Sequence, residues 1–214
     1  MARFAPEGKP FMTAFAVLTG LAFVFGSKAL TTIFLIGLLF MAYFFRDPER
    51  TVPDREDVYL SPADGKVIVV GPAREERFIG GNALEVGIFM SPLDVHVNRA
   101  PCDGVVTSVV HSPGKFLSAF KPEASLLNEQ ISLLLDTARG KVLIRQVAGF
   151  VARRAVCRVK AGDRLSRGER FGIIKFSSRV DVYLPAGTVP AVKIGDRVKA
   201  GETVIGHVQG YHAV

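Results

Sequence analysis

The stretch FGIIKFSSRVDVYLP, residues 171–185, decides how this chain folds. Two runs rich in branched and aromatic residues, 171–176 and 180–184, flank a tandem serine, and polar residues alternate with apolar ones in the second run. Such runs, bounded by turn residues, are typical of β-strands. A polar turn between strands also contains serine frequently. The stretch therefore predicts two strands, and leaves open whether Ser177 and Ser178 form only a turn or perform chemistry.

The same strand signal recurs along the chain from about residue 58. Five further short apolar runs are separated by turn residues at short intervals, namely 66–70, 84–89, 105–111, 131–136 and 142–147. Helical periodicity is scarce in this part of the chain. Many short strands at close spacing favour a mostly β domain, built as a sandwich or a barrel.

An internal repeat supports a hairpin-rich fold. VKAGDRLSRGE at residues 159–169 recurs as VKIGDRVKAGE at residues 192–202, and ADGKV at 63–67 has a fainter partner in CDGVV at 102–106. The Gly-Asp and Gly-Glu pairs predict tight turns that bracket a short strand. These units resemble the hairpins of biotinyl and lipoyl carrier domains. The Met-Lys-Met or Asp-Lys-Ala tripeptide of those carriers is absent, so a swinging-arm carrier is not expected.

The first 45 residues differ from the rest. Residues 11–25 and 29–45 are uncharged, and a break at 26–28 separates them. Each run is shorter than the ~20 residues of a straight membrane-crossing helix, so we expect a hairpin of two short membrane helices. Basic residues on both flanks favour a cytoplasmic location for both ends, and the second run argues against a cleaved signal peptide. The expected organisation is a membrane-anchoring helical hairpin over 1–45, a linker over 46–57 and a β domain over 58–214.

Charge and cysteine content narrow the partners. The net charge of +7 suggests attraction to an anionic membrane. Lysine and arginine are scattered without interleaved aromatic residues, so nucleic acid is not an expected partner. Cys102 and Cys157 lack the spacing of metal ligands, and we interpret them as small buried residues in a reducing compartment. No metal site is expected.

Three polar residues together supply the parts of a nucleophilic site. Ser178 Oγ is a weak nucleophile until a base removes its proton. His96, in the polar segment 91–99, is suited to act as a general base near neutral pH. Asp64, in an Asp-Gly turn, completes the pattern as the residue that orients the base. Each also has a structural alternative, as a turn residue or a hydrogen-bonded histidine of the core.

The order of several motifs resembles that of phosphatidylserine decarboxylase, and most closely its short bacterial form. The matching motifs are SPADG at 61–65, PLDVHVNRAP at 92–101, HSPGKF at 111–116, Asn-Glu at 128–129, RFG at 170–172 and FxSxV at 176–180. The resemblance runs from about residue 46 to about residue 208. It implies a pyruvoyl-dependent lyase that converts phosphatidylserine to phosphatidylethanolamine at the inner membrane of the cell, with its catalytic domain on the cytoplasmic side.

The resemblance also implies roles for the three polar residues. Asp64 orients and charges His96, His96 deprotonates Ser178, and Ser178 attacks the carbonyl of residue 177. The ester that forms is cleaved by β-elimination, which separates a β chain ending at residue 177 from an α chain of residues 178–214. The dehydroalanine left at 178 hydrolyses to the pyruvoyl cofactor, which serves as an electron sink for decarboxylation. His96 is also the candidate for returning a proton to the product.

Position 177 departs from the family pattern, because the family has Gly-Ser at the cleaved bond and this chain has Ser177-Ser178. Glycine accepts positive φ, and serine in a strained conformation costs about 1–3 kcal/mol. The simplest interpretation is an uncleaved proenzyme. A variant that still cleaves, and an attack by Ser177 on the carbonyl of Phe176, are the alternatives.

Four further residues are candidates for substrate binding. Arg99 stands where many long-form relatives have a second histidine, and its guanidinium suits a carboxylate or phosphate. Asp94 lies in the same segment, and Phe116 and Phe120 lie in an apolar and basic loop that we interpret as a lipid-facing lip. A homo-oligomer is left open.

Three other functions compete with this interpretation. An archaetidylserine-type decarboxylase would use the same chemistry on a different glycerol backbone. A non-catalytic lipid-binding relative would account for Ser177. A membrane adaptor of an efflux system would also combine an anchor with carrier-like hairpins, but the long coiled-coil insertion that it requires has no heptad run to form it.

Overall fold

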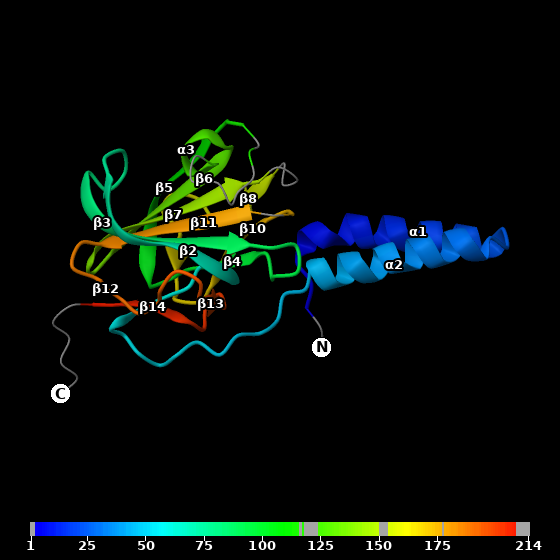
Figure 1. The fold of residues 1–214 in the computed structure, drawn as a ribbon, viewed down its shortest axis with the longest axis horizontal. Helices are drawn as coiled ribbons and strands as arrows, with labels where there is room; N and C mark the ends of the chain where they lie inside the picture. Colours follow the sequence, from blue (N-terminus) through cyan, green and yellow to red (C-terminus); the bar gives the residue numbers. More distant parts are fainter. Residues whose placement is uncertain (1–2, 116, 118–123, 150–153, 177, 209–214) are drawn as a thin grey trace. The chain divides into compact units, whose positions relative to one another are not determined.

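The computed structural model describes residues 3–115, 117, 124–149, 154–176 and 178–208 (Figure 1). The chain divides into two compact units, Met1–Glu49 and Arg50–Val214. The first unit consists mainly of helices and the second mainly of strands, so the two units are described separately.

The first unit is a helical hairpin. A short 3-10 turn, η1 (Pro6–Gly8), precedes α1 (Lys9–Val24) and α2 (Lys28–Phe44). Gly26 occupies the turn between the helices with a φ of 72°, a conformation that glycine adopts without strain. The hairpin that the two apolar runs predict is therefore confirmed as a structure.

The membrane part of that prediction is not supported. α1 contains 16 residues and α2 contains 17. In the described part of the chain, no helix combines the length and the apolar character needed to cross a membrane.

The second unit is mostly β, as the short runs predict. The one short helix in its described part is α3 (Ala124–Leu127). Its strands are β1 (Val58–Leu60), β2 (Gly65–Glu75), β3 (Gly81–Met90), β4 (Val97–Arg99), β5 (Gly104–Ser112), β6 (Gln130–Thr137), β7 (Gly140–Ala148), β8 (Ala155–Cys157), β9 (Arg164–Leu165), β10 (Arg170–Ile174), β11 (Ser178–Pro185), β12 (Val189–Pro190), β13 (Arg197–Val198) and β14 (Val204–His207).

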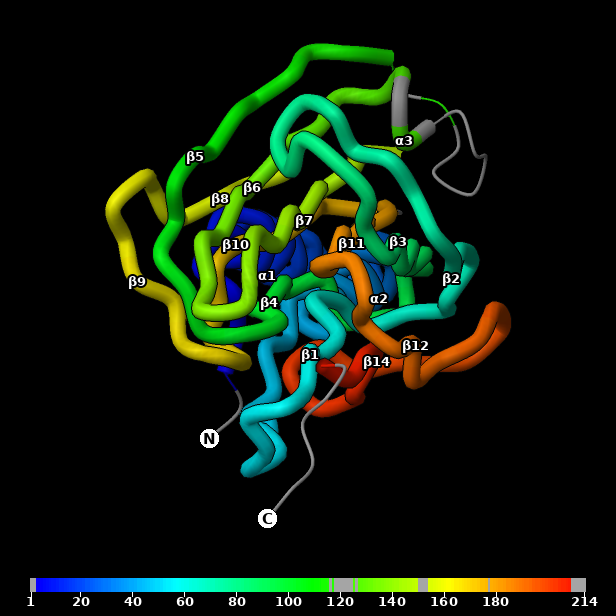
Figure 2. Tube along the Cα trace, turned by 90° about the vertical axis from the view of Figure 1, so that its left-hand side faces the viewer, coloured from blue at the N-terminus to red at the C-terminus, as the bar shows by residue number. Residues whose placement is uncertain are grey.

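The main sheet has eight strands in the order β13-β2-β3-β11-β7-β6-β5-β9, and all neighbouring strands are antiparallel. Figure 2 shows this succession from β9 across to β2. The sheet curls into a half-barrel, so the expected sandwich or barrel takes the form of an open, curled sheet. Two three-stranded sheets, β1-β14-β12 and β4-β10-β8, complete the unit.

The sequence repeat forms two matching sets of contacts at the two edges of the main sheet. On one edge, Gly195 N donates to Val67 O and Val67 N donates to Asp196 O. On the other edge, Gly162 N donates to Val106 O and Val106 N donates to Asp163 O. Each Gly-Asp turn of the strong repeat is thus hydrogen-bonded to the strand that begins at one of the two Asp-Gly units. The two copies of the strong repeat therefore contact the two copies of the faint repeat in the same way.

Strand β11 lies in the middle of the main sheet, between β3 and β7. Its residues from Ser178 to Pro185 pair with β3, and those from Ser178 to Tyr183 also pair with β7. Val180, Val182 and Leu184 point into the hydrophobic core, where each is fully buried. The alternation in the opening stretch of sequence therefore corresponds to one apolar face and one polar face of a central strand.

Core packing around β11 gives a direct stability prediction. Ile144 on β7 is fully buried and pairs with Val182, whereas Ile194 is 64% exposed. We expect Ile144→Ala to lower the free energy of unfolding by about 2–4 kcal/mol, because it leaves a cavity in the core. We expect Ile194→Ala to change it by less than about 0.5 kcal/mol. Denaturant titration of both variants checks this, and similar losses for both would contradict the assigned core.

Candidate functional site

Ser178 is the first residue of β11 and is completely buried. Its backbone is fixed on both sides, because it pairs with Met90 at the end of β3 and with Ala148 at the end of β7. Its hydroxyl group donates toward Met90 Sδ, 3.4 Å away. Thioether sulfur is a weak acceptor, so this contact holds the hydroxyl group only weakly. The serine is therefore fixed in position and shielded from water, while its hydroxyl group keeps the freedom to rotate.

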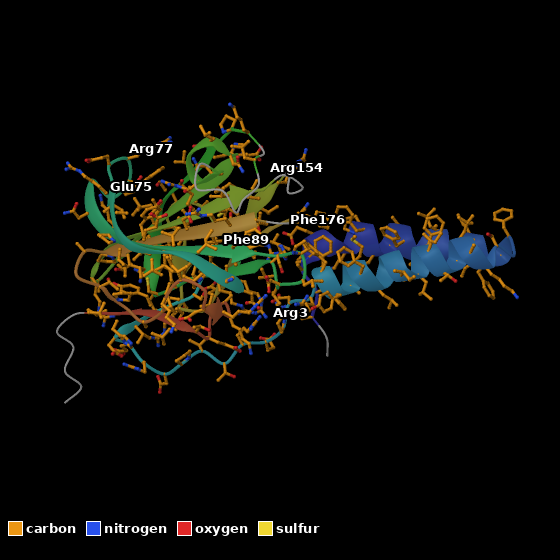
Figure 3. The ribbon with its side chains drawn as sticks, viewed as in Figure 1. Arg3, Glu75, Arg77, Phe89, Arg154 and Phe176 are labelled. Atoms are coloured by element: carbon orange, nitrogen blue, oxygen red, sulfur yellow. The ribbon has the colours of Figure 1, made fainter. Side chains whose placement is uncertain are left out.

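The chain turns sharply just before this serine. Strand β10 ends at Ile174, two residues before the end expected from the sequence. Phe176 has a φ of 58°, the one positive φ among the described non-glycine residues. The left-handed conformation costs a residue with a side chain about 1–2 kcal/mol. Backbone strain therefore lies two residues before Ser178, and Ser177 itself falls outside the described residues (Phe176 is labelled in Figure 3).

His96 is fully buried and precedes β4, which pairs with β10. Its backbone O accepts a hydrogen bond from Ile174 N at 3.3 Å, which places the histidine backbone against the end of β10. Its ring atom Nδ1 lies 2.9 Å from Asp94 O. The histidine and the serine thus lie in one region, where β3 and β10 end and β11 begins. The hydroxyl group of Ser178 contacts Met90 Sδ in this structure.

Asp94 closes the loop that carries His96. Its Oδ2 accepts hydrogen bonds from both N and Oγ of Ser91, each at 2.8 Å. Its Oδ1 lies 3.0 Å from Nη1 of Arg197, a largely exposed side chain. These contacts fix the turn whose carbonyl holds the His96 ring. A role for Asp94 in substrate binding stays a prediction.

The carboxylate of Asp64 contacts Arg50 and the backbone of Ala200, and its expected role beside His96 stays a prediction. Its Oδ2 lies 2.8 Å from Nη2 of Arg50, and its Oδ1 accepts a hydrogen bond from Ala200 N at 2.8 Å. Burial raises the pKa of this carboxyl group, while the hydrogen bond from Ala200 and the charge of Arg50 oppose that rise. Asp103, its counterpart in the repeat, likewise accepts from a backbone amide, that of Arg167. The carboxylate of Asp64 therefore closes a repeated turn, and the His96 ring is held by a backbone carbonyl.

The side chain of Arg99 is buried and contacts the backbone of a turn. It is 5% exposed, and its Nη1 donates to Gly168 O at 2.9 Å. Gly168 belongs to the turn that precedes β10, so the arginine joins β4 to this turn. Its expected role in binding a carboxylate or phosphate stays a prediction. Phe116 and Phe120 lie outside the described residues.

Two buried amides that the sequence interpretation did not assign to the site lie beside the serine. Asn98 Nδ2 is 3.8 Å from Met90 Sδ, the same sulfur atom that contacts Ser178. Asn98 Oδ1 accepts a hydrogen bond from Gln146 Nε2 at 2.8 Å. In the sequence, the position of Gln146 as a polar residue inside the apolar run 142–147 was the feature that could have pointed to it. Asn98 and Gln146 thus form a buried pair of amides that shares the Met90 sulfur contact with the serine.

A third amide connects the site to the following loop. Asn128 is 1% exposed, and its Nδ2 donates to Ala148 O at 2.7 Å and to Leu117 O at 2.8 Å. Its Oδ1 accepts from Leu117 N, also at 2.8 Å. Ala148 is the strand partner of Ser178. Asn128 therefore fastens Leu117 to the strand end that flanks the serine.

Comparison with known proteins agrees with this arrangement. A family model described as phosphatidylserine decarboxylase matches residues 38–206. Proteins named phosphatidylserine decarboxylase proenzyme are 46% identical in Desulfotalea psychrophila, 46% in Geobacter sulfurreducens and 49% in Symbiobacterium thermophilum. These alignments cover 94–95% of this chain and 95–96% of the relatives. The chain belongs to the phosphatidylserine decarboxylase family.

Proposed function

We propose that this protein converts phosphatidylserine to phosphatidylethanolamine with a pyruvoyl group formed from its own Ser178. The observation that carries the proposal is a fully buried serine that opens the central strand, with a buried histidine held in the same region. The relatives are named proenzymes, a name that fits activation by cleavage of the chain. An archaetidylserine-type substrate would use the same site, and a comparison of the two lipids as substrates distinguishes them.

The contact of the His96 ring with Asp94 O favours the tautomer that a general base needs. A carbonyl oxygen only accepts hydrogen bonds, so the 2.9 Å contact with Asp94 O places the proton of a neutral His96 on Nδ1. The lone pair then lies on Nε2, a buried atom. A base with its lone pair in a buried site, next to a strand end that carries a serine, is suited to remove the serine proton.

The self-cleavage that we propose follows from these positions. Ser178 Oγ turns from Met90, gives its proton to His96, and attacks the carbonyl carbon of residue 177. The peptide C–N bond breaks as an ester forms. Loss of the Cα proton of residue 178 and cleavage of its Cβ–O bond then release a carboxylate at residue 177. Water converts the remaining dehydroalanine to a ketone and ammonia. Strain at Phe176 favours cleavage, because breaking the chain releases it.

The residues present fit a pyruvoyl group at position 178. The site is dry, since Ser178 is fully buried, and Asn98 provides an amide near the same sulfur atom that the serine contacts. A pyruvoyl group supplies an electron sink that decarboxylation requires. The protein fixes the residue at this position through its pairing with Met90 and Ala148, and we propose that His96 returns a proton to the product.

After such a cleavage the two chains are expected to stay together. The segment from residue 178 onward contributes β11, β12, β13 and β14. β11 pairs with β3 and β7, and β13 pairs with β2. Arg50 adds an ion pair with Asp64 and one with Glu202, at 2.8 and 3.5 Å, so it bridges the two segments. A heterodimer of β and α chains is therefore the proposed mature form.

The helical hairpin is the proposed membrane contact. Several of its large apolar side chains are strongly exposed, including Phe23 at 74%, Val24 at 79% and Phe25 at 83%. Soluble surfaces rarely expose so much apolar area together. We propose that the hairpin inserts into the lipid of an anionic inner membrane, with the catalytic unit on the cytoplasmic side, as the flanking basic residues indicate.

Self-cleavage is tested by replacing Ser177 with glycine. We expect Ser177→Gly to cleave at 177–178 faster than the parent chain, because glycine removes steric restriction at the attacked carbonyl. In that background, His96→Ala is expected to reduce the cleavage rate at least about 100-fold, as loss of a general base does. His111→Ala, an exposed histidine, is the matched control and is expected to leave it unchanged.

Intact-mass measurement over time follows both chains, and release of carbon dioxide from phosphatidylserine follows the second reaction. Normal cleavage in the His96→Ala variant would exclude the histidine as the base. Absence of cleavage in every version, including Ser177→Gly, would favour a non-catalytic lipid-binding protein.

The tautomer of His96 is open to direct observation. In an uncleaved Ser178→Ala protein with ¹⁵N-labelled histidine, we expect the neutral His96 ring to carry its proton on Nδ1. The chemical shifts of the two ring nitrogens report this distribution, and His111 in the same spectrum serves as the internal comparison. A neutral ring protonated at Nε2 would contradict the contact with Asp94 O and the proposed base.

Membrane association is tested by flotation of the full chain with vesicles that contain phosphatidylglycerol. We expect the double variant Phe23→Asp, Phe25→Asp to bind at least about tenfold less, because carboxylates disfavour insertion into lipid. The control is the double variant Val189→Asp, Ile194→Asp, which places the same charges on exposed apolar positions of the second unit. Equal losses in both variants would show a charge effect and exclude the hairpin as the contact.

A further inference from the structure

A row of buried charged side chains covers the face of the main sheet opposite the hydrophobic core. Arg179, Asp181 and Tyr183 alternate with the core residues of β11, so they share that opposite face. Their side chains contact Ser125 in α3, Glu85 on β3 and Arg145 on β7. Arg145 in turn contacts Glu75 on β2. Figure 3 labels Glu75 toward one end of the sheet and Phe176 toward the other.

Arg179, the residue after the serine, is held by two carboxylates. It is 3% exposed, its Nε donates to Asp181 Oδ1, and its Nη2 lies 3.3 Å from Glu85 Oε1. Burial of a guanidinium is costly unless carboxylates compensate the charge. The two partners lie on different strands, since Asp181 is on β11 and Glu85 is on β3. The side chain therefore ties the beginning of β11 to its neighbour, independently of the backbone ladder.

The space for this contact is provided by a glycine. Gly87 on β3 is the strand partner of Asp181. A Cβ atom at Gly87 would lie 2.9 Å from Asp181 Oδ1 and 3.0 Å from Arg179 Nη2. These distances are too short for ordinary van der Waals contact, so any larger residue would displace the ion pair. Gly87 thus leaves room for the pair of Arg179 and Asp181.

Both carboxylates have second partners that fix their positions. Ser125 Oγ, in α3, donates to Asp181 Oδ2 at 2.6 Å, and Asp181 is completely buried. Tyr183 OH lies 3.4 Å from Glu85 Oε1 and accepts from Arg145 Nη1 at 3.1 Å. Burial is the main cause that raises the pKa of Glu85, and Arg179 opposes it. Each carboxylate is therefore held by a contact besides the one with Arg179.

Cleavage between residues 177 and 178 would change what this network must do. In the intact chain, residue 178 is held by its covalent link to the turn after β10. After cleavage it is a chain end, and chain ends fray unless side chains fasten them. The first peptide N–H of the α chain would then belong to Arg179. Fraying here would move the cofactor-bearing residue relative to His96.

We propose that Arg179 is a positioning residue, whose ion pairs with Asp181 and Glu85 keep the cofactor-bearing end of the α chain in the sheet after cleavage. The inference rests on the proposed function, because it concerns the cleaved form. In this proposal, the polar network is needed to hold residue 178 only after the chain has been cleaved. A purely structural network would stabilise the intact and the cleaved protein equally.

The test compares amide hydrogen exchange in cleaved and uncleaved protein. The cleaved form is the Ser177→Gly protein after complete processing, and the uncleaved form carries Ser178→Ala in addition. Arg179→Lys is introduced into both, since lysine keeps the charge but cannot donate to two carboxylates with a planar group. Arg145→Lys is the matched control: a buried arginine of the same network that contacts Tyr183 and Glu75 rather than the beginning of β11.

We expect Arg179→Lys to accelerate exchange of the β11 amides nearest residue 178 at least about tenfold in the cleaved protein, and less than about twofold in the uncleaved protein. Arg145→Lys is expected to change exchange there by less than about twofold in both. Ser125→Ala, which removes only one hydrogen bond to Asp181, is the second variant and should give a smaller change in the same direction. In steady-state assays, Arg179→Lys is expected to lower kcat and leave KM unchanged.

The outcomes separate this inference from the proposed function. If the Ser177→Gly protein does not cleave, the proposed function fails before Arg179 is tested. If it cleaves and Arg179→Lys changes exchange equally in both forms, the network is structural and the positioning role is overturned. If Arg179→Lys does not fold, exchange is compared between the cleaved and uncleaved forms of Ser125→Ala, and an equal change in both forms overturns the positioning role. An equal effect of Arg145→Lys at the beginning of β11 would also overturn the inference.

Discussion

The hydrogen-bonded ladder that holds β11 between β3 and β7 is the constraint on which the rest of the site depends. Ser178 to Tyr183 are paired on both sides, so this strand has little freedom to shift along its neighbours. A shift by one residue would bring the Arg179 side chain into the core and turn Ser178 away from Met90. The buried apolar face and the buried charged face of the same strand both oppose such a shift. The position of the nucleophile is thus set by the whole sheet.

The repeated hairpins explain the contacts of Asp64. Asp64 and Asp103 occupy equivalent positions and each accepts a hydrogen bond from a backbone amide of the later repeat. This shared contact belongs to the architecture of the two sheet edges, and Asp64 adds an ion pair with Arg50 to it. The ring of His96 contacts the carbonyl of Asp94, in a loop that the Asp94 carboxylate closes. A neutral acceptor fixes the ring without adding a second charge to a buried site.

The local features of the fold were predictable from the sequence. Alternation in residues 180–184 gave the faces of β11, and the Gly-Asp repeat gave the turns at both edges of the sheet. Helical hairpin formation followed from two uncharged runs, although no described helix has the length and apolar character needed to cross a membrane. Motif order also led to the family, which the relatives confirm.

Contacts between distant segments were not predictable in the same way. The contacts of Asp64 with Arg50 and Ala200 were not predicted, because an aspartate in an Asp-Gly turn has the same local sequence whatever it contacts. Gln146 contacts Asn98, and Ser125 contacts Asp181, across 48 and 56 residues of chain. Such pairs depend on the order of strands in the sheet, which no local pattern encodes. The alternating polar residues of β11 indicated only an outward face, whereas the structure buries them as an ionic network.

The most direct measurement is native mass spectrometry of the Ser177→Gly protein after processing. The central claim is that the nucleophile lies on β11, and that this strand of the α chain is hydrogen-bonded on both sides to β3 and β7 of the β chain. It predicts that the chains of residues 1–177 and 178–214 remain one particle under native conditions and separate only in denaturant. Dissociation of the small chain in native buffer would contradict a central, doubly paired β11 and the account built on it.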